Sequence, residues 1–128
     1  MAGHITIMTF GYKFGPPGPG FKHIADVRNI PAVFAEPDQK GTDPKVKAAV
    51  MAKPAAKAWL AKMEKWSLSD GDKVAIGCAR GHHRSVAVAS EYASYLRGQG
   101  YSVTLNNRDI SKKYSLSIGE YLLYLRNR

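Results

Sequence analysis

Four short segments of the chain have the pattern of β-strands. Residues 5–10 alternate between apolar and polar positions and are rich in β-branched side chains, as expected for a strand with one buried face. Residues 73–77 form a short apolar run of the kind found in buried parallel strands. Residues 23–27 and 101–105 have the same strand character and are bounded by polar loops. We therefore expect a sheet of about four strands.

Helical patterns follow the strands at 23–27, 73–77 and 101–105. Asp43 is a candidate N-cap residue, and the proline that follows it suits the first position of a helix. A helix is therefore expected over about 44–66, interrupted or kinked at Pro54. A second helix is expected from about 84 to 97, and a final amphipathic stretch predicts a helix at about 116–126.

The alternation of strands and helices predicts a single α/β domain over residues 1–128. Its expected architecture is a mostly parallel, twisted sheet with helices on both faces. With 45% hydrophobic and 23% charged residues, a chain of 128 residues can bury a core without disulfides or metals. We find no apolar run long enough to span a membrane and no signal-peptide pattern. The single cysteine, Cys78, excludes an internal disulfide and makes the cytoplasm the expected compartment.

The chain is strongly basic. Nineteen Lys and Arg residues against ten Asp and Glu give a formal net charge of +9 and a pI near 9.8. Such a charge attracts polyanions and phosphorylated ligands. The alternative interpretation is a solvated basic surface that keeps a small protein soluble.

The segment 77–85 is the strongest candidate for a binding site. It connects an apolar strand to a helix, and the first amides of a helix, with its dipole, attract anions. Arginine side chains there can each hold two phosphate oxygens, and Gly81 permits a close backbone approach. The candidate anion-binding residues of this loop are Cys78, Ala79, Arg80, Gly81, His82, His83, Arg84 and Ser85.

Basic residues also follow the other predicted strands. Lys13 lies in the Gly/Pro-rich loop 11–20, Arg28 follows the second strand, and Arg108 follows the last one. Because the carboxyl ends of parallel strands meet at one edge of a sheet, these residues are expected to share an anion pocket with the 77–85 loop. Two adjacent histidines without a set of four Cys or His ligands do not predict a metal site, and no cofactor is expected.

Three blocks of the sequence carry a family resemblance. They are an aromatic-Gly-Lys loop at 10–15, an Asp-Val-Arg block at 26–28, and a Gly-Cys…His-Arg-Ser loop at 76–86, with a fainter match at 108–112. In kind, spacing and order they resemble the C-terminal domain of the bacterial RNase adapter protein RapZ. The residues that correspond by position are Lys13, Arg28, His83, Arg84 and Ser85.

The resemblance implies a regulatory module of bacterial or phage origin. Such a module would bind small regulatory RNA, sense an amino-sugar phosphate in its basic pocket, form a homo-oligomer and cooperate with a nuclease. The sequence departs from the family pattern at Phe34, Ala79, Arg80 and Asn107, which bears on the choice of sugar. It also lacks the phosphate-binding motif of the family's N-terminal domain, so nucleotide hydrolysis is not predicted.

Two further interpretations stay open beside this one. The loop 78–85 also resembles the Cys-x-x-Gly-x-x-Arg-Ser loop of cysteine-dependent phosphatases, in which a thiolate attacks phosphorus. In that alternative the catalytic residues are Cys78, Arg84, Ser85 and one acid among Asp26, Asp38 and Asp109. A third interpretation is a small scaffold whose 118–125 helix docks a partner.

Aromatic residues accompany the basic loops. Tyr12, Phe14 and Tyr114 are candidates for stacking on RNA bases, with ordinary packing as the alternative. The leading prediction is therefore a module that binds RNA and phosphorylated metabolites rather than an enzyme.

Overall fold

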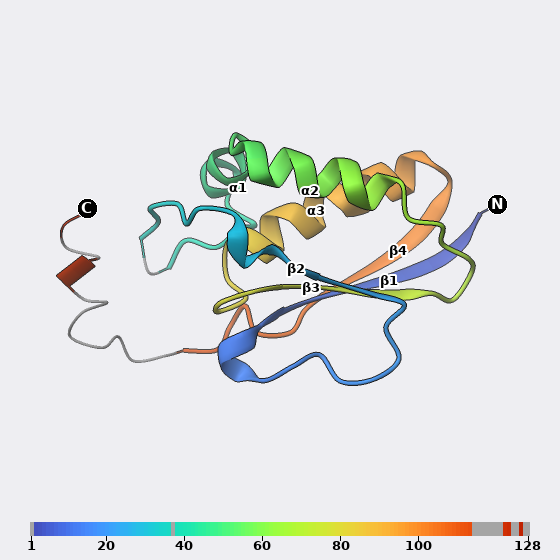
Figure 1. Ribbon diagram of the computed structural model, residues 1–128, viewed down its shortest axis with the longest axis horizontal. Helices are drawn as coiled ribbons and strands as arrows, with labels where there is room; N and C mark the ends of the chain where they lie inside the picture. The colour runs from blue at the N-terminus through green and yellow to red at the C-terminus, as the bar shows by residue number, and fades with distance from the viewer. Residues whose placement is uncertain (1, 37, 114–121, 124–125, 127–128) are drawn as a thin grey trace.

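The computed structural model describes residues 2–36, 38–113, 122–123 and 126 (Figure 1). Its elements are, in chain order, β1 (Gly3–Gly11), η1 (Tyr12–Phe14), β2 (His23–Asp26), η2 (Val27–Asn29), α1 (Pro44–Met51), α2 (Pro54–Glu64), β3 (Lys73–Cys78), α3 (Arg84–Gly98) and β4 (Tyr101–Asn107). The strands form one sheet in the order β2-β3-β1-β4, and every pair is parallel. The predicted α/β class and four-stranded parallel sheet are confirmed.

The main core lies between the sheet and the helices. Ile5 and Ile7 of β1 and Val74 and Ile76 of β3 point to this side and are fully buried. The helix α3 packs directly on the sheet, and α1 and α2 pack against α3 (Figure 1). The apolar face of α2 belongs to this core, because Met63 is fully buried and Trp59 and Leu60 pack on the same cluster.

All three of these helices lie on one face of the sheet, whereas the sequence pattern led us to expect helices on both (Figure 1). The other face carries a smaller cluster of Met8, Phe10 and Ala75, against which Tyr12 and Phe21 pack. The connection from β1 to β2 runs over that face (Figure 1). Its Gly- and Pro-rich sequence disfavours an α-helix, so beyond the short 3-10 turn η1 the crossover on this side is a loop.

Pro54 marks the boundary between α1 and α2. The interruption expected at Pro54 is real: α1 ends at Met51, and the proline is the first residue of α2. The helix predicted at about 116–126 lies mostly outside the described residues. Among the residues that are described, no helix is long and apolar enough to cross a membrane.

Candidate anion-binding site

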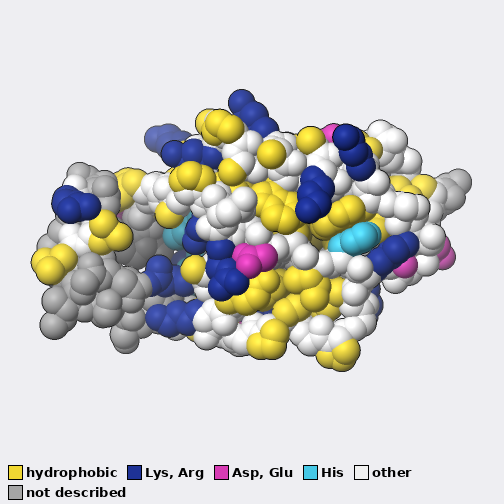
Figure 2. Space-filling view, in the orientation of Figure 1, with side chains coloured by type: hydrophobic (Ala, Val, Ile, Leu, Met, Phe, Trp, Pro, Cys, Tyr) yellow, Lys and Arg dark blue, Asp and Glu magenta, His cyan; other side chains and the backbone are white. Residues whose placement is uncertain are grey.

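The carboxyl ends of the four strands lie at one edge of the sheet, on the left in Figure 1. Figure 2 shows a group of Lys and Arg side chains left of centre, toward this end. The segments that leave this edge contain every basic residue of the predicted site, namely Lys13, Arg28, Arg80, His82, His83, Arg84 and Arg108. The topology thus brings these segments together as the parallel arrangement predicts, while their role as anion ligands stays a prediction.

The loop after β3 crosses directly over the end of β1. A Cβ atom at Gly11 would lie 2.2 Å from the carbonyl carbon of Arg80, and one at Gly81 would lie 2.7 Å from the Gly11 nitrogen. Gly81 also has a φ of +76°, which favours glycine. The Lys13 amide donates to the Ala79 carbonyl at 3.0 Å. The two loops are therefore joined backbone to backbone, and both glycines are needed for this approach.

The helix α3 begins at the centre of the edge. Its N-cap residue, His83, makes no side-chain capping hydrogen bond, which leaves the amides of the first turn without that acceptor. Ser85 is fully buried, and its Oγ lies 3.2 Å from the Sγ of Cys78, which is 3% exposed. A positive helix end beside basic side chains is an arrangement that suits an anion.

Positive charge surrounds the two histidines of the loop. His82 is 2% exposed, and its Nδ1 lies 3.3 Å from the Nζ of Lys40. Burial, followed by the charges of Lys40 and His83, lowers the pKa of His82. Burial also lowers the pKa of His83; the hydrogen bond with the Gln39 carbonyl acts in the opposite direction, and the charges of Lys40, Arg84 and Arg80 lower the pKa further. The lowered pKa values favour the neutral imidazoles, and a bound anion would favour their protonated forms.

Lys40 is a member of this group that sequence analysis missed. The residue is half-buried and lies in the loop between η2 and α1. The adjacent Gly41 donates its amide to the His82 carbonyl at 2.7 Å, and a Cβ there would lie 2.4 Å from the His83 carbonyl oxygen. A glycine beside a lysine in a polar loop was the available signal, but nothing in the sequence linked that loop to residues forty positions later.

Two arginines of the predicted site hold the backbone and one another in place. Arg84 donates from Nη1 to the carbonyls of Arg28 and Ile30, each at 3.0 Å. The Arg28 guanidinium donates to both carboxylate oxygens of Asp26, at 2.9 and 2.7 Å. These contacts fix the turn after β2 against the start of α3.

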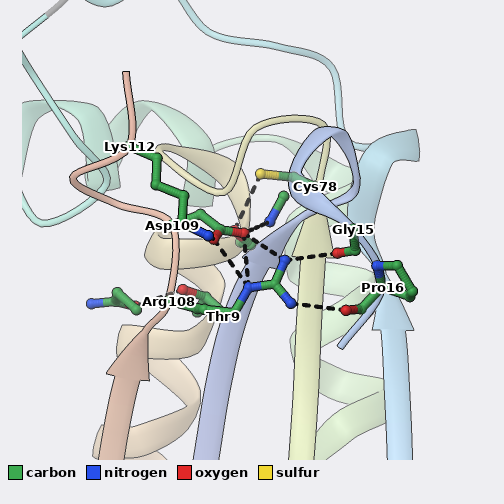
Figure 3. Close-up of polar contacts among 10 residues, drawn as sticks. Thr9, Gly15, Pro16, Cys78, Arg108, Asp109 and Lys112 are labelled. Atoms are coloured by element: carbon green, nitrogen blue, oxygen red, sulfur yellow. Dashed lines mark hydrogen bonds and ion pairs between the residues drawn. The ribbon is translucent and has the colours of Figure 1, made fainter. Parts of the chain in front are cut away.

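Arg108 has partners that differ from those we expected. Its guanidinium donates to the carbonyls of Gly15 and Pro16, at 2.7 and 2.8 Å, and to the carboxylate of Asp109 (Figure 3). All three of its nitrogens thus meet protein oxygens, because the Gly/Pro segment folds back over the end of β4. In this structure the Arg108 side chain binds the Gly/Pro segment instead of facing an anion pocket.

Asp109 is the acidic partner of Arg108. Its carboxylate is fully buried and accepts from the Gly11 amide at 2.7 Å and from Lys112 at 2.7 Å, in addition to Arg108 (Figure 3). Burial by itself would raise the pKa of Asp109, but the hydrogen bonds from Arg108, Gly11 and Lys112 lower it to about 2. A carboxylate with that pKa is ionised at neutral pH and cannot supply a proton as a general acid.

The other acids of the phosphatase alternative are no better suited to that role. The hydrogen bonds from Arg28 lower the pKa of Asp26, and Asp38 is an exposed residue of the loop before α1. Asp109 and Asp26 are therefore poor candidates for the general acid of a phosphatase.

Comparison with known proteins shows the family of this chain. The family model of the RapZ C-terminal domain matches residues 3–111. A nucleotide-binding protein of Anaeromyxobacter sp. (strain K) is 36% identical over 122 residues, which cover 85% of this chain and 41% of that protein. A nucleotide-binding protein of Caldicellulosiruptor bescii is 39% identical over 121 residues, covering 84% and 41%. The chain thus spans about two-fifths of the length of these curated relatives. It belongs to the family of the RapZ C-terminal domain.

Proposed function

We propose that this domain is a regulatory binding module that takes phosphate groups, of RNA or of a phosphorylated metabolite, at the carboxyl edge of its sheet. The observation that carries the proposal is the gathering of cationic segments around the first turn of α3. The residues concerned are Lys13, Lys40, Arg80, His82, His83 and Arg84.

The electrostatics of the edge support an anionic ligand. The pKa values of His82 and His83 are lowered in part by neighbouring cations, so both imidazoles lie within the repulsive field of these like charges. A phosphate group placed among them would relieve this repulsion and would accept hydrogen bonds from the helix amides. Exposed Lys13 and half-buried Arg80 are the side chains best placed to reach it.

RNA is favoured as one ligand by the charge of the whole chain. A formal net charge of +9 suits a partner that presents many phosphates. The curated relatives are named nucleotide-binding proteins, a description that fits ligands bearing phosphate. A nuclease partner, self-association and a cytoplasmic location complete the proposal, as the RapZ resemblance implies.

A thermal-shift titration tests phosphate binding. Inorganic phosphate, a phosphosugar and a nucleotide are each titrated, and the midpoint Tm should rise with the logarithm of ligand excess over Kd. Lys13→Ala should weaken binding roughly tenfold or more, the value of one charge-assisted hydrogen bond. Lys73→Ala is the matched control, because Lys73 is exposed at the amino end of β3. The proposal fails if none of the ligands shifts Tm or if both variants bind like the parent chain.

Phosphatase activity is the second candidate, favoured by the contact between Cys78 and Ser85. A serine hydroxyl beside the nucleophile is what that chemistry would use to help the thiolate leave. Under this alternative the domain hydrolyses an aryl phosphate, and Cys78→Ser abolishes turnover while phosphate binding persists. Under the binding proposal the parent chain shows no turnover above background.

A further inference from the structure

We propose that the Arg28 guanidinium is a stacking surface for a planar heteroaromatic ring, such as the base of a nucleotide whose phosphate occupies the edge site. This inference rests on the proposed phosphate site and names the class of ligand that binds there. It begins from Tyr12, whose ring is one of the sequence-based candidates for base stacking. The Cζ atom of Arg28 lies 3.9 Å from the centroid of that ring.

The Arg28 guanidinium lies over the Tyr12 ring, where a base would otherwise stack. Phe10 meets the same tyrosine edge to face, with ring centroids 4.8 Å apart and planes at 64°. With Arg28 on one side and a buried phenylalanine packed against it, Tyr12 serves as the support of the stack. The surface offered to a ligand is therefore the outer face of the Arg28 plane.

Asp26 fixes that plane in orientation. Its carboxylate accepts from Arg28 Nε at 2.9 Å and from Nη2 at 2.7 Å, and it also accepts from the Arg28 amide at 3.1 Å. A bidentate pair of this kind holds the guanidinium rigidly. The Arg28 side chain nevertheless stays 49% exposed, since the tyrosine covers one face and the carboxylate covers one edge.

The ion pair also decides what Arg28 can bind. Its Nε and Nη2 already donate to Asp26, so Arg28 has fewer donors left for a phosphate than an unpaired arginine. Its flat surface is unaffected by that pairing, and RNA-binding proteins use guanidinium planes as well as aromatic rings to stack bases. Arg28 is thus better suited to a ring than to the phosphate role that the sequence suggested.

The stack adjoins the proposed phosphate site. The carbonyl of Arg28 accepts from Arg84 Nη1 at 3.0 Å, and Arg84 is the first residue of α3. Tyr12 immediately precedes Lys13 in η1. A single nucleotide can therefore place its phosphate at the helix start and its base on Arg28.

Calorimetric titration of the full chain tests the subsite with three probes: AMP, ribose 5-phosphate and inorganic phosphate. We expect AMP to bind about 5- to 100-fold more tightly than ribose 5-phosphate, which is the range that stacking of one base provides. Arg28→Lys keeps the charge but lacks the plane, so in this variant AMP should bind no more tightly than ribose 5-phosphate. Tyr12→Phe keeps the supporting ring and should preserve the preference for AMP.

The outcomes separate this inference from the function on which it rests. If ribose 5-phosphate and AMP bind the parent chain equally well, the stacking subsite is refuted while phosphate binding stands. If no probe binds, the proposed function itself fails. A single-stranded hexa-adenylate RNA shows whether the base that stacks on Arg28 belongs to RNA or to a free nucleotide. If it belongs to RNA, the oligonucleotide binds the parent chain more tightly than AMP does and loses affinity in Arg28→Lys. If Arg28→Lys has a lower Tm than the parent chain without ligand, a second variant is needed. Tyr12→Leu removes the ring under the guanidinium and must then lose affinity for AMP but not for ribose 5-phosphate.

Discussion

Asp109 is the residue at which the segments after β1 and β4 meet. Its buried carboxylate receives the Gly11 amide from the end of β1 and the side chains of Arg108 and Lys112 from the segment after β4. The same Arg108 reaches the carbonyls of the Gly/Pro segment. One buried charge thus sets the position of the backbone that leads to Lys13, without itself facing a ligand.

Asp109→Asn should lower the free energy of unfolding by on the order of 2–3 kcal/mol at pH 7. The pKa of Asp109 is about 2 in the folded chain, below the value of about 3.9 in the unfolded chain. The ionised carboxylate therefore stabilises the fold above pH 4–5, and this contribution disappears as the pH falls toward 2. Urea denaturation at pH 7 and pH 3 measures it: the difference between parent and variant should shrink at the lower pH. Asp38→Asn, at an exposed site, is the control, and a difference that stays constant with pH would contradict this account.

At the scale of elements, the crossing of the loop 79–81 over β1 determines whether the site exists. This crossing needs two backbones closer than a side chain allows, at Gly11 and Gly81. Gly77 adds a third close contact, because a Cβ there would lie 2.4 Å from the ring of Phe10. Packing of the loop on the strand end therefore depends on the smallest side chain at each of these positions.

Gly81→Ala should destabilise the domain more than Gly18→Ala, by about 1–3 kcal/mol, the usual cost of overpacking. Both glycines have positive φ, +76° and +85°, so both variants share the backbone strain. Only Gly81 has backbone atoms of Gly11 and Phe10 within 3 Å of a new Cβ, whereas Gly18 has nothing within 4 Å. Chemical denaturation compares the variants, and phosphate affinity should fall only in Gly81→Ala. Equal stability of the two would show that the loop can move away from β1.

At the scale of the whole molecule, a parallel sheet makes the two ends of the domain chemically different. One edge collects the carboxyl ends of every described strand and the basic segments that follow them. Exposed lysines also occur elsewhere, for example Lys73 at the opposite edge. If the net charge acted only as a diffuse field, all of these lysines would contribute alike to RNA binding.

The salt dependence of RNA binding separates a localised site from a diffuse field. For a single-stranded RNA oligonucleotide, the logarithm of the association constant should fall linearly with the logarithm of salt concentration. Lys13→Ala should reduce the magnitude of that slope by about 0.7, the value of one phosphate contact on a single strand, while Lys73→Ala should leave it unchanged. Fluorescence anisotropy at several salt concentrations provides the measurement. Affinity that does not change with salt would eliminate RNA phosphates as ligands.

The sequence by itself determined the class of fold and the place where the basic segments meet. Hydrophobic periodicity located β1, β3 and α3 to within a few residues, and proline located the break between α1 and α2. Once the strands are parallel, their carboxyl ends must share an edge, so the meeting of those segments followed from local patterns alone.

Only the tertiary structure decided which partner each side chain takes. Arg108 binds carbonyls more than ninety positions away, and Lys40 approaches His82 across a loop whose path no periodicity describes. The placement of α1, α2 and α3 on one face of the sheet likewise depended on which connection crosses the other face (Figure 1). Periodicity reports which face of an element is buried, whereas a hydrogen bond depends on the distance between two atoms, and that distance exists only after distant segments have packed.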